Sequence, residues 1–269
     1  MINYDKLFEN LETQNISNLT YVDELKSKKI SISTITINCN IGTNVFVETI
    51  YKYCKLDIEN ILSITYGDRK TALSGKTILS NKKKTNKKKK FFYNQITIQT
   101  NHLEQRINKK KKEKPINIKI FKNGNLHLTG CRHIEDFKFA IKKLLPVLIK
   151  GQDEIIGNKE EHIEFVSNVS DITLCNFKVR MINSNYKLDF EIDRNRLINI
   201  VKQQSTLSNF INDFGFIKCM SEATGRHSCV NLSYYFDKEI NNKNKSSIFI
   251  FRTGSVVITG SKSYEQIII

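Results

Sequence analysis

Two stretches of the chain share one pattern of apolar and polar positions. Residues 118–137 read IKIFKNGNLHLTGCRHIEDF and residues 248–267 read IFIFRTGSVVITGSKSYEQI, with seven identities at an offset of 130. Each stretch has an alternating apolar run, a turn that contains glycine, and a second alternating run that ends in Thr-Gly. Alternation with period two is typical of strands, so each stretch predicts a β-hairpin. The acidic residue after each hairpin predicts the start of a helix.

The helix predicted after the first hairpin has a clear apolar stripe. Its apolar positions recur every three to four residues: Phe137, Ile141, Leu144, Leu145 and Leu148. Pro146 is expected to kink or shorten this helix, because proline lacks the N–H that a helix interior uses. The second copy reaches only one turn of the equivalent helix, so we expect a truncated final helix.

The segments before each hairpin also match, although less closely. Residues 32–41 alternate like a strand and residues 45–54 have helical spacing. In the second half, residues 177–190 read as strand material and residues 194–201 as a helix. The order strand, helix, strands, hairpin and helix therefore occurs twice, which predicts an α+β fold made of two repeats.

The repeats set the expected domain organisation. Short strands at 96–98 and 230–232 come before the two hairpins. We expect an N-terminal tail at residues 1–30, a first repeat at 31–150 and a second repeat at 151–269.

The second hairpin is apolar on both faces, because side chains alternate along a strand. The inner set is Ile248, Ile250, Val256 and Ile258, and the opposite set is Phe249, Phe251, Val257 and Thr259. Either a second protein layer covers the opposite face, as in a sandwich, or a partner does. The equivalent set in the first copy is Lys119, Phe121, His127 and Thr129. Since lysine and histidine are costly to bury unpaired, this set favours an open surface that faces a ligand.

The charge distribution points to the kind of ligand. The chain has 43 lysine and arginine residues against 27 aspartate and glutamate residues, a formal charge of +16, which predicts a polyanionic partner. Twelve lysines and one glutamate lie in the runs 82–90 and 109–114, which leaves about +5 elsewhere. We expect Lys-rich insertions at about 67–91 and 105–115. They are either flexible segments with weak phosphate contact, or an import signal or nucleic-acid arm.

Composition excludes several classes of protein. With 269 residues and 39% hydrophobic content, the chain can bury a sizeable core. No apolar run approaches the roughly 20 residues that span a bilayer, and no signal sequence begins the chain. None of the six cysteines lies in a CxxC pair, so we expect reduced thiols in an intracellular protein that is not secreted.

Candidate catalytic chemistry is sparse. The sequence has no G-x-S-x-G, P-loop or G-x-G-x-x-G motif. His127, Cys131 and His133 are close in sequence but lack zinc spacing and a second ligand pair. We therefore expect no enzyme, no cofactor and no metal site.

The doubled pattern I-F-x-x-G-x-x-x-x-T-G, followed by an acidic helix start, resembles the TATA-box-binding protein family. The phrases FYNQITI at 92–98 and KIFKNGNLHLTGC at 119–131, and the lysine-rich insertion before Phe91, are similar to its divergent members in large DNA viruses. The resemblance covers residues 31–269. It implies a saddle, which is a curved antiparallel sheet with helices on the convex face and the minor groove of DNA on the concave face.

The resemblance also implies partners and a location. The expected partner is double-stranded, A·T-rich DNA, with a TFIIB-like factor and the RNA polymerase machinery as further partners. The expected location is the nucleus or a viral factory in the cytoplasm. The loop at 222–226 differs from the acidic, proline-containing loop that holds the TFIIB-type partner in the family, which puts standard recruitment in doubt.

Four positions correspond to the aromatic wedges that the family inserts between base pairs. Phe121 and Phe251 match the hairpin phenylalanine of each half. Phe92 or Tyr93 matches the second wedge of the first half, and its counterpart in the second half is His227. One of the four aromatic wedges is thus replaced.

Other positions correspond to groove contacts. Threonines and apolar residues of the hairpins match at Thr129, Thr259, Phe249 and Val257. The asparagine that the family places on the first strand of each half falls near Thr34, Thr36, Met181 and Asn183. Lys119 and His127 replace apolar groove contacts, which implies a relaxed A·T preference. The sequence thus predicts a DNA-binding transcription-initiation factor. The alternative is a saddle-shaped protein-interaction module with only generic DNA affinity through its lysine loops.

Overall fold

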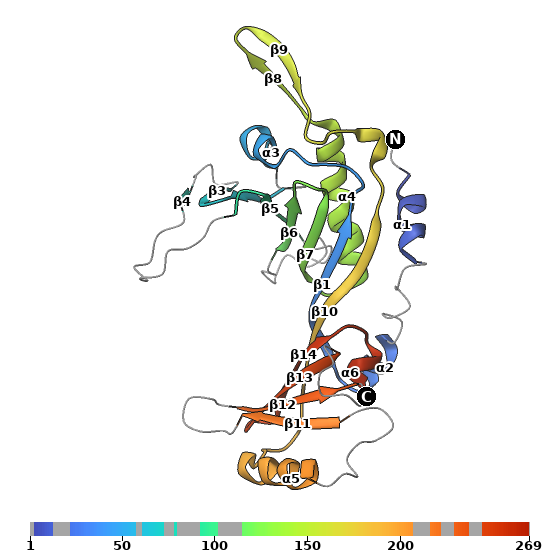
Figure 1. Ribbon diagram of the computed structural model, residues 1–269, viewed down its shortest axis with the longest axis vertical. Helices are drawn as coiled ribbons and strands as arrows, with labels where there is room; N and C mark the ends of the chain where they lie inside the picture. The colour runs from blue at the N-terminus through green and yellow to red at the C-terminus, as the bar shows by residue number, and fades with distance from the viewer. Residues whose placement is uncertain are drawn as a thin grey trace. The chain divides into compact units, whose positions relative to one another are not determined.

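The computed structural model describes residues 3–12, 22–57, 61–72, 78–79, 92–101, 115–206, 216–221, 229–236 and 244–268. The chain forms two compact units (Figure 1). Unit 1 comprises residues 1–15 and 36–178, and unit 2 comprises residues 16–35 and 179–269.

Unit 1 is a sheet with helices on one side. Its strands are β1 (Ser31–Asn40), β2 (Ser63–Tyr66), β3 (Arg69–Ala72), β4 (Ile78–Leu79), β5 (Gln95–Thr100), β6 (Ile116–Phe121) and β7 (Asn125–Cys131), in the order β1-β7-β6-β5-β2-β3-β4. Its helices are α1 (Tyr4–Glu12), α3 (Val47–Tyr53) and α4 (Ile134–Lys150). A separate hairpin, β8 (Gln152–Ile156) with β9 (Lys159–Ile163), and a short 3-10 helix, η3 (Val169–Asp171), follow α4.

Unit 2 repeats this plan. Its strands are β10 (Cys175–Lys187), β11 (Phe216–Ser221), β12 (Cys229–Tyr235), β13 (Lys245–Phe251) and β14 (Ser255–Ser261), in the order β11-β12-β13-β14-β10. Its helices are α2 (Val22–Ser27), α5 (Arg194–Thr206) and α6 (Glu265–Ile268). The first residues of β1 and the last of β10 belong to unit 2, and their other ends belong to unit 1.

The core of unit 1 lies between one face of the sheet and its helices. Alternate residues of β5, β6 and β7 are fully buried: Ile96, Ile98, Ile118, Ile120, Leu126 and Leu128. The stripe predicted on α4 is buried at all five positions, and Phe137 of this stripe stacks edge-on against Phe177, with the ring centroids 5.3 Å apart. The alternation along the strands therefore gives the sheet one buried face, which α4 covers (Figure 1).

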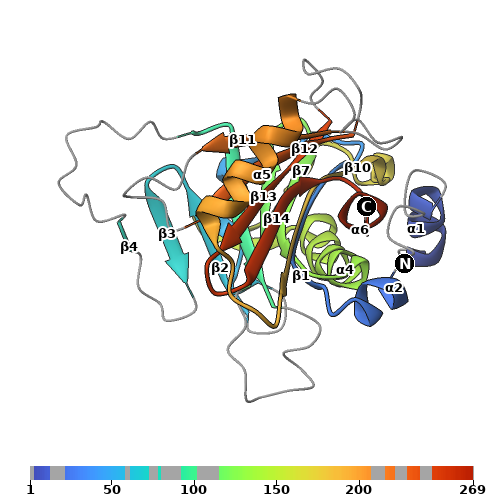
Figure 2. The ribbon, with the colours of Figure 1, turned by 90° about the horizontal axis from the view of Figure 1, so that it is seen from below.

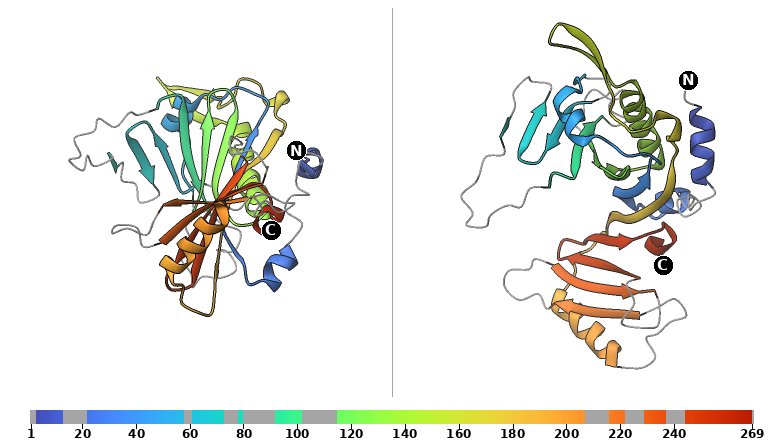
Figure 3. Two further views of the ribbon diagram at one scale, coloured as in Figure 1. Left: turned by 60° about the horizontal axis from the view of Figure 1, so that its bottom comes forward. Right: turned by 45° about the horizontal axis from the view of Figure 1, so that its top comes forward.

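The core of unit 2 is built in the same way but is smaller. Ile198 and Val201 of α5 pack with Val230 and Leu232 of β12. Of the inner residues predicted for the second hairpin, Val256 and Ile258 are buried, and Ile248 and Ile250 are partly buried against this cluster. Helix α5 lies against the sheet of unit 2 (Figures 2 and 3).

The two hairpin turns are equivalent in detail. The φ of Gly124 is +77° and that of Gly254 is +79°, and each glycine N–H donates to the carbonyl of the preceding phenylalanine, Phe121 or Phe251, at 3.0 Å. Asn123 does not share the positive φ, so the turn is a type I turn closed by a left-handed glycine. Each turn also accepts two backbone hydrogen bonds from the segment after the first strand, from Ile41 and Val45 in unit 1 and from Leu188 and Ile192 in unit 2. The equivalent donors are 147 residues apart, so the first strands of the two repeats align at an offset of 147. The predicted α+β class with two repeats is confirmed.

The helix after each hairpin begins with the same device. Asp136 Oδ2 accepts from the backbone N–H of Arg132 at 2.8 Å and of His133 at 3.3 Å, and Gln266 Oε1 accepts from Lys262 at 2.7 Å. These two side chains are equivalent at the offset of 130. A side-chain acceptor at this place satisfies N–H groups that a helix start leaves without partners.

Replacing this acceptor should destabilise unit 1. Asp136→Ala removes both hydrogen bonds from a side chain that is only 3% exposed, so we expect the free energy of unfolding to fall by about 1–3 kcal/mol. Urea unfolding checks this. Glu135→Ala on the same turn is the control, since Glu135 is exposed and forms a surface ion pair with Lys138, and it should cost less than about 0.5 kcal/mol.

Two features differ from the expectations, and a third adds a short helix to the N-terminal tail. Helix α4 continues four residues beyond Pro146 to Lys150, so the expected shortening is wrong; Pro146 is exposed on a helix that packing stabilises. The insertion expected from about residue 67 begins with a paired strand, β3, against β2. The N-terminal segment contains helix α1, whose buried Phe8 lies 5.8 Å from the ammonium of Lys142 on α4.

Candidate nucleic-acid interface

The face of unit 1 that points away from α4 is polar and open. Its central row consists of side chains directly opposite one another on successive strands: Lys70, Thr65, Thr97, Lys119 and His127. All five are partly exposed. Lys119 and His127, which the sequence analysis placed on this face, are therefore not buried in a core. Among the described residues of this unit, no second protein layer covers the face as it would in a sandwich.

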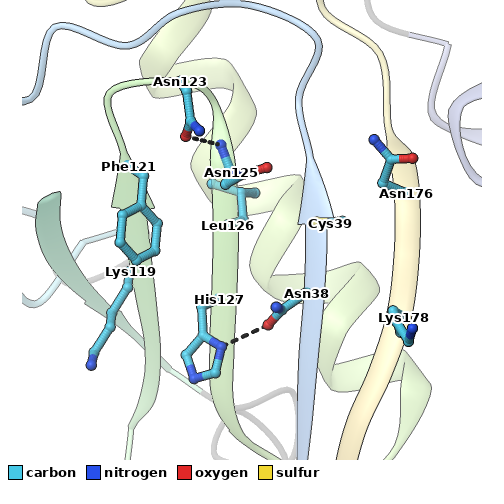
Figure 4. A pocket seen from close by; sticks show the side chains of 10 residues that line it. All are labelled: Asn38, Cys39, Lys119, Phe121, Asn123, Asn125, Leu126, His127, Asn176 and Lys178. Carbon is cyan, nitrogen blue, oxygen red and sulfur yellow. Dashed lines mark hydrogen bonds between the residues drawn. The ribbon is translucent and has the colours of Figure 1, made fainter. Parts of the chain in front are cut away.

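Hydrogen bonds extend this row onto the neighbouring strand. Nδ1 of His127 lies 2.6 Å from Oδ1 of Asn38 on β1. The amide nitrogen of Asn40 donates to Oδ1 of Asn125 at 2.7 Å and to the carbonyl of Asn123 at 3.1 Å. Figure 4 shows His127 and Asn38 among the side chains that line a hollow of about 530 Å³; the full lining is Asn38, Cys39, Lys119, Phe121, Asn123, Asn125, Leu126, His127, Asn176 and Lys178.

A second row on the same face is a chain of side-chain amides. Gln99 Oε1 accepts from Ser63 Oγ at 2.6 Å and from Lys70 Nζ at 3.3 Å, and Gln99 Nε2 donates to Asn117 Oδ1 at 2.8 Å. Thr129 lies directly opposite Asn117. These contacts hold hydrogen-bonding groups in fixed positions on the sheet surface, so a ligand would meet an ordered polar face.

The equivalent face of unit 2 is more apolar. Its central row consists of Asn231, Phe249, Val257 and Asn185, again directly opposite one another. All four are partly exposed. The hydroxyl of Thr259 donates to Oδ1 of Asn183 at 2.5 Å. The apolar outer set predicted for the second hairpin is thus not covered by the described residues.

Aromatic side chains lie at the edge of each face. Phe121 and Phe251 end their strands immediately before the glycine turns and are partly exposed. Phe92 is 61% exposed and Tyr93 is 52% exposed. Tyr93 stacks edge-on against Tyr66 with centroids 5.5 Å apart, and Tyr66 donates its hydroxyl to the carbonyl of Tyr93 at 3.2 Å. Desolvation, with smaller contributions from Glu48 and Tyr93, raises the pKa of Tyr66, so it stays a neutral donor.

The remaining predicted positions lie on the first strands. At the offset of 147, Thr34 of β1 corresponds to Met181 of β10 and Thr36 to Asn183. Thr36 is only 6% exposed, which makes it the least accessible of the set. His227 and the loop at 222–226 lie outside the described residues.

Several polar residues of the interface escaped the sequence analysis. Asn38 and Asn40 share the parity of Thr34 and Thr36 along β1, so strand alternation alone could have found them. Asn125 and the pair Gln99 and Asn117 depend on register between strands, which the sequence does not show.

The cysteines whose surroundings the structure describes are not joined in disulfides. Cys39, Cys54, Cys131, Cys175 and Cys229 are free thiols. Burial, and to a smaller extent Asp136, raises the pKa of Cys131 to about 12, so its thiol is protonated at neutral pH. In the ranges that the structure describes, no three side chains of the metal-binding types come together, and no helix is both long and apolar enough to cross a bilayer.

The chain is similar to a viral protein in sequence. No family model matches the chain. The chain is 39% identical over 247 residues to the "TATA-box-binding protein-like" protein of Acanthamoeba polyphaga mimivirus, a match that covers 91% of this chain and 63% of the viral protein. The chain therefore spans less than two thirds of that relative's length. The solved structure of Methanococcus jannaschii TBP aligns with a TM-score of 0.42 and 16% identity, over 88% of this chain and 91% of that one.

The fold and the two open faces define a duplicated α+β protein with one exposed sheet surface per repeat. The resemblance predicted from the two hairpins is confirmed by the identity to the viral protein. Over 91% of its length, the chain is similar to a TATA-box-binding protein-like protein of a large DNA virus.

Proposed function

We propose that this protein binds double-stranded DNA in the minor groove of A·T-rich sequence, bends it, and thereby helps to initiate transcription. One observation carries the proposal: in each repeat, one face of the sheet is packed against helices while the other is open and ends in a hairpin phenylalanine. The name of the viral relative, and the net charge of +16, support DNA as the partner.

The chemistry of the open faces suits this groove. The minor groove offers few discriminating groups at A·T pairs, so a sheet surface of phenylalanine, valine and threonine can fill it. Apolar wedges at Phe121 and Phe251 can unstack base steps, at a cost of a few kcal/mol per step. A bent duplex then contacts more protein, which offsets this cost. Recruitment of a TFIIB-like factor and polymerase belongs to the same proposal.

Bending measured by fluorescence energy transfer tests the proposal directly. A duplex labelled at both ends, in an A·T-rich and a G·C-rich version, is titrated with the protein at two salt concentrations. Preferential binding of the A·T-rich duplex with a large bend is the expected result. Equal, steeply salt-dependent binding without a bend would contradict it, and would favour the protein-interaction module instead.

Phe92 and Tyr93 should differ in this assay. Tyr93 is held against Tyr66, and its ring lies 2.3 Å from where a Cβ on Gly67 would be, whereas Phe92 is the more exposed of the two. We expect Phe92→Ala to lower affinity about tenfold and to reduce the bend, because an exposed ring is buried only in the complex. Tyr93→Ala should instead lower thermal stability, and a larger loss of bending for Tyr93→Ala than for Phe92→Ala would identify Tyr93 as the wedge.

The lysine run at 82–90 should contribute affinity without selectivity. Deleting it removes seven positive charges, so binding should weaken by the same factor for A·T-rich and G·C-rich duplexes, and the dependence of affinity on salt should flatten. Equilibrium titrations over a range of salt concentrations measure both effects. A change in the ratio of the two affinities would show that the run takes part in sequence recognition.

A further inference from the structure

We propose that the two repeats read different base pairs: the first repeat tolerates G·C pairs in the minor groove, whereas the second repeat accepts only A·T pairs. The inference rests on the proposed DNA-binding function and assigns a specificity to each half of it. It depends on the central rows of the two open faces.

The two central rows occupy equivalent places. Lys119 lies directly opposite His127 in the first repeat, as Phe249 lies directly opposite Val257 in the second, and the offset of 130 aligns the two pairs. Both rows end at an asparagine of the first strand. The repeats therefore present different chemistry at one and the same position of a shared framework.

G·C pairs differ from A·T pairs in the minor groove by one donor, the N2 amino group of guanine. A donor that loses its water on binding needs an acceptor on the protein, or binding becomes weaker. The centre of the second row cannot supply one, because the side chains of Phe249 and Val257 have no hydrogen-bonding atoms.

The acceptors of the second row lie at its two ends. Oδ1 of Asn231 is buried, and no described group donates to it. Oδ1 of Asn185 accepts from Ser31 while its nitrogen donates to Ser33 at 2.6 Å, so this amide is held toward the start of the first strand. A guanine amino group above Phe249 and Val257 would therefore have no acceptor directly below it.

The first repeat offers acceptors in the same area. Oδ1 of Asn38 accepts from His127, and Oδ1 of Asn125 accepts from Asn40. An amide oxygen has two lone pairs, so each can accept a second hydrogen bond from guanine N2. Their present partners already orient these amides around the hollow shown in Figure 4, so little ordering is needed on binding. Lys119 adds a donor for the N3 and O2 acceptors that A·T and G·C pairs share.

A substitution series in the DNA tests the inference. Starting from the A·T-rich duplex that the full chain binds best, single A·T pairs are replaced in turn by G·C or by inosine·C, which lacks the N2 amino group. Competition binding gives the affinity of each duplex. We expect a loss of about tenfold or more for G·C in one half of the site, restored by inosine, and a loss of less than about threefold in the other half.

Paired protein variants assign the halves. Lys119→Phe combined with His127→Val gives the first repeat the central pair of the second, and the tolerant half should then reject G·C by about tenfold. The reciprocal variant, Phe249→Thr with Val257→Thr, adds hydroxyl acceptors to the second repeat and should make the intolerant half accept G·C. Thermal unfolding shows whether each variant is folded, and each G·C affinity is expressed relative to the affinity of the same variant for the unsubstituted duplex.

The outcomes separate the two proposals. If no duplex is bent, the minor-groove function itself is wrong, and the inference falls with it. If the duplex is bent but both halves reject G·C equally, or if the paired variants leave the pattern of tolerance unchanged, the inference alone is overturned.

Discussion

Replacing both hairpin phenylalanines, Phe121→Ala with Phe251→Ala, should abolish the bending of A·T-rich DNA and lower affinity by about 100-fold or more. Each ring is only partly buried in the protein and would become fully buried between base pairs, a transfer worth about 1.5–3 kcal/mol per ring. Without wedges the base steps stay stacked, so the duplex remains straight and contacts less of the sheet. Energy transfer between the duplex ends reports the bend, and a titration reports the affinity.

A phenylalanine on the helix layer is the matched control. Phe139 lies on α4 next to Lys143, away from the open face, and is partly exposed like the two hairpin residues. Phe139→Ala should leave both the bend and the affinity unchanged within about twofold. If the hairpin double variant bends DNA as well as the control does, the two phenylalanines are packing residues and the wedge assignment is wrong. The single variants then need no further test.

The two hairpins were predictable because their signals are local. A glycine at a fixed place between two alternating runs specifies both the turn and the faces of its strands, as the matching φ values of Gly124 and Gly254 show. The apolar stripe of α4 was equally readable, since helical spacing lies within one segment. The effect of Pro146 on this helix could not be predicted from the sequence, because packing against the sheet decides whether the helix tolerates a proline.

The interface was only partly predictable because its chemistry depends on register. The residues from the hairpins were placed on the open face by alternation alone. The contacts of His127 with Asn38 and of Asn125 with Asn40 join segments more than eighty residues apart, and no local pattern specifies which residues meet across such a gap. The same holds for the pairing of β3 with β2, where the charged sequence from Arg69 to Ala72 reads as loop but is held by its neighbour.

Gly124→Ala should be the most destabilising single substitution of a surface turn in unit 1. A Cβ at this position would lie 2.2 Å from the carbonyl oxygen of Thr43, and the φ of +77° is unfavourable for alanine. To relieve the clash, the turn must move away from the segment that follows β1, which breaks the backbone hydrogen bonds from Ile41 and Val45 to the turn. We expect the free energy of unfolding to fall by about 3 kcal/mol or more, as measured by urea unfolding.

Gly157 separates the two causes of this loss. It also has a positive φ, +57°, in the turn between β8 and β9, but a Cβ there would have no atom within 4 Å. Gly157→Ala therefore carries only the cost of the backbone conformation, about 1–2 kcal/mol. The additional loss in the free energy of unfolding for Gly124→Ala, relative to Gly157→Ala, measures the contribution of the contact between the hairpin turn and residues 41–45.

The two variants should also differ in DNA bending. Because Gly124 N–H donates to the carbonyl of Phe121, movement of the turn in Gly124→Ala should displace the phenylalanine wedge and reduce bending, whereas Gly157→Ala should leave bending intact. Equal losses of stability in the two variants would show that the turn is not held by this contact.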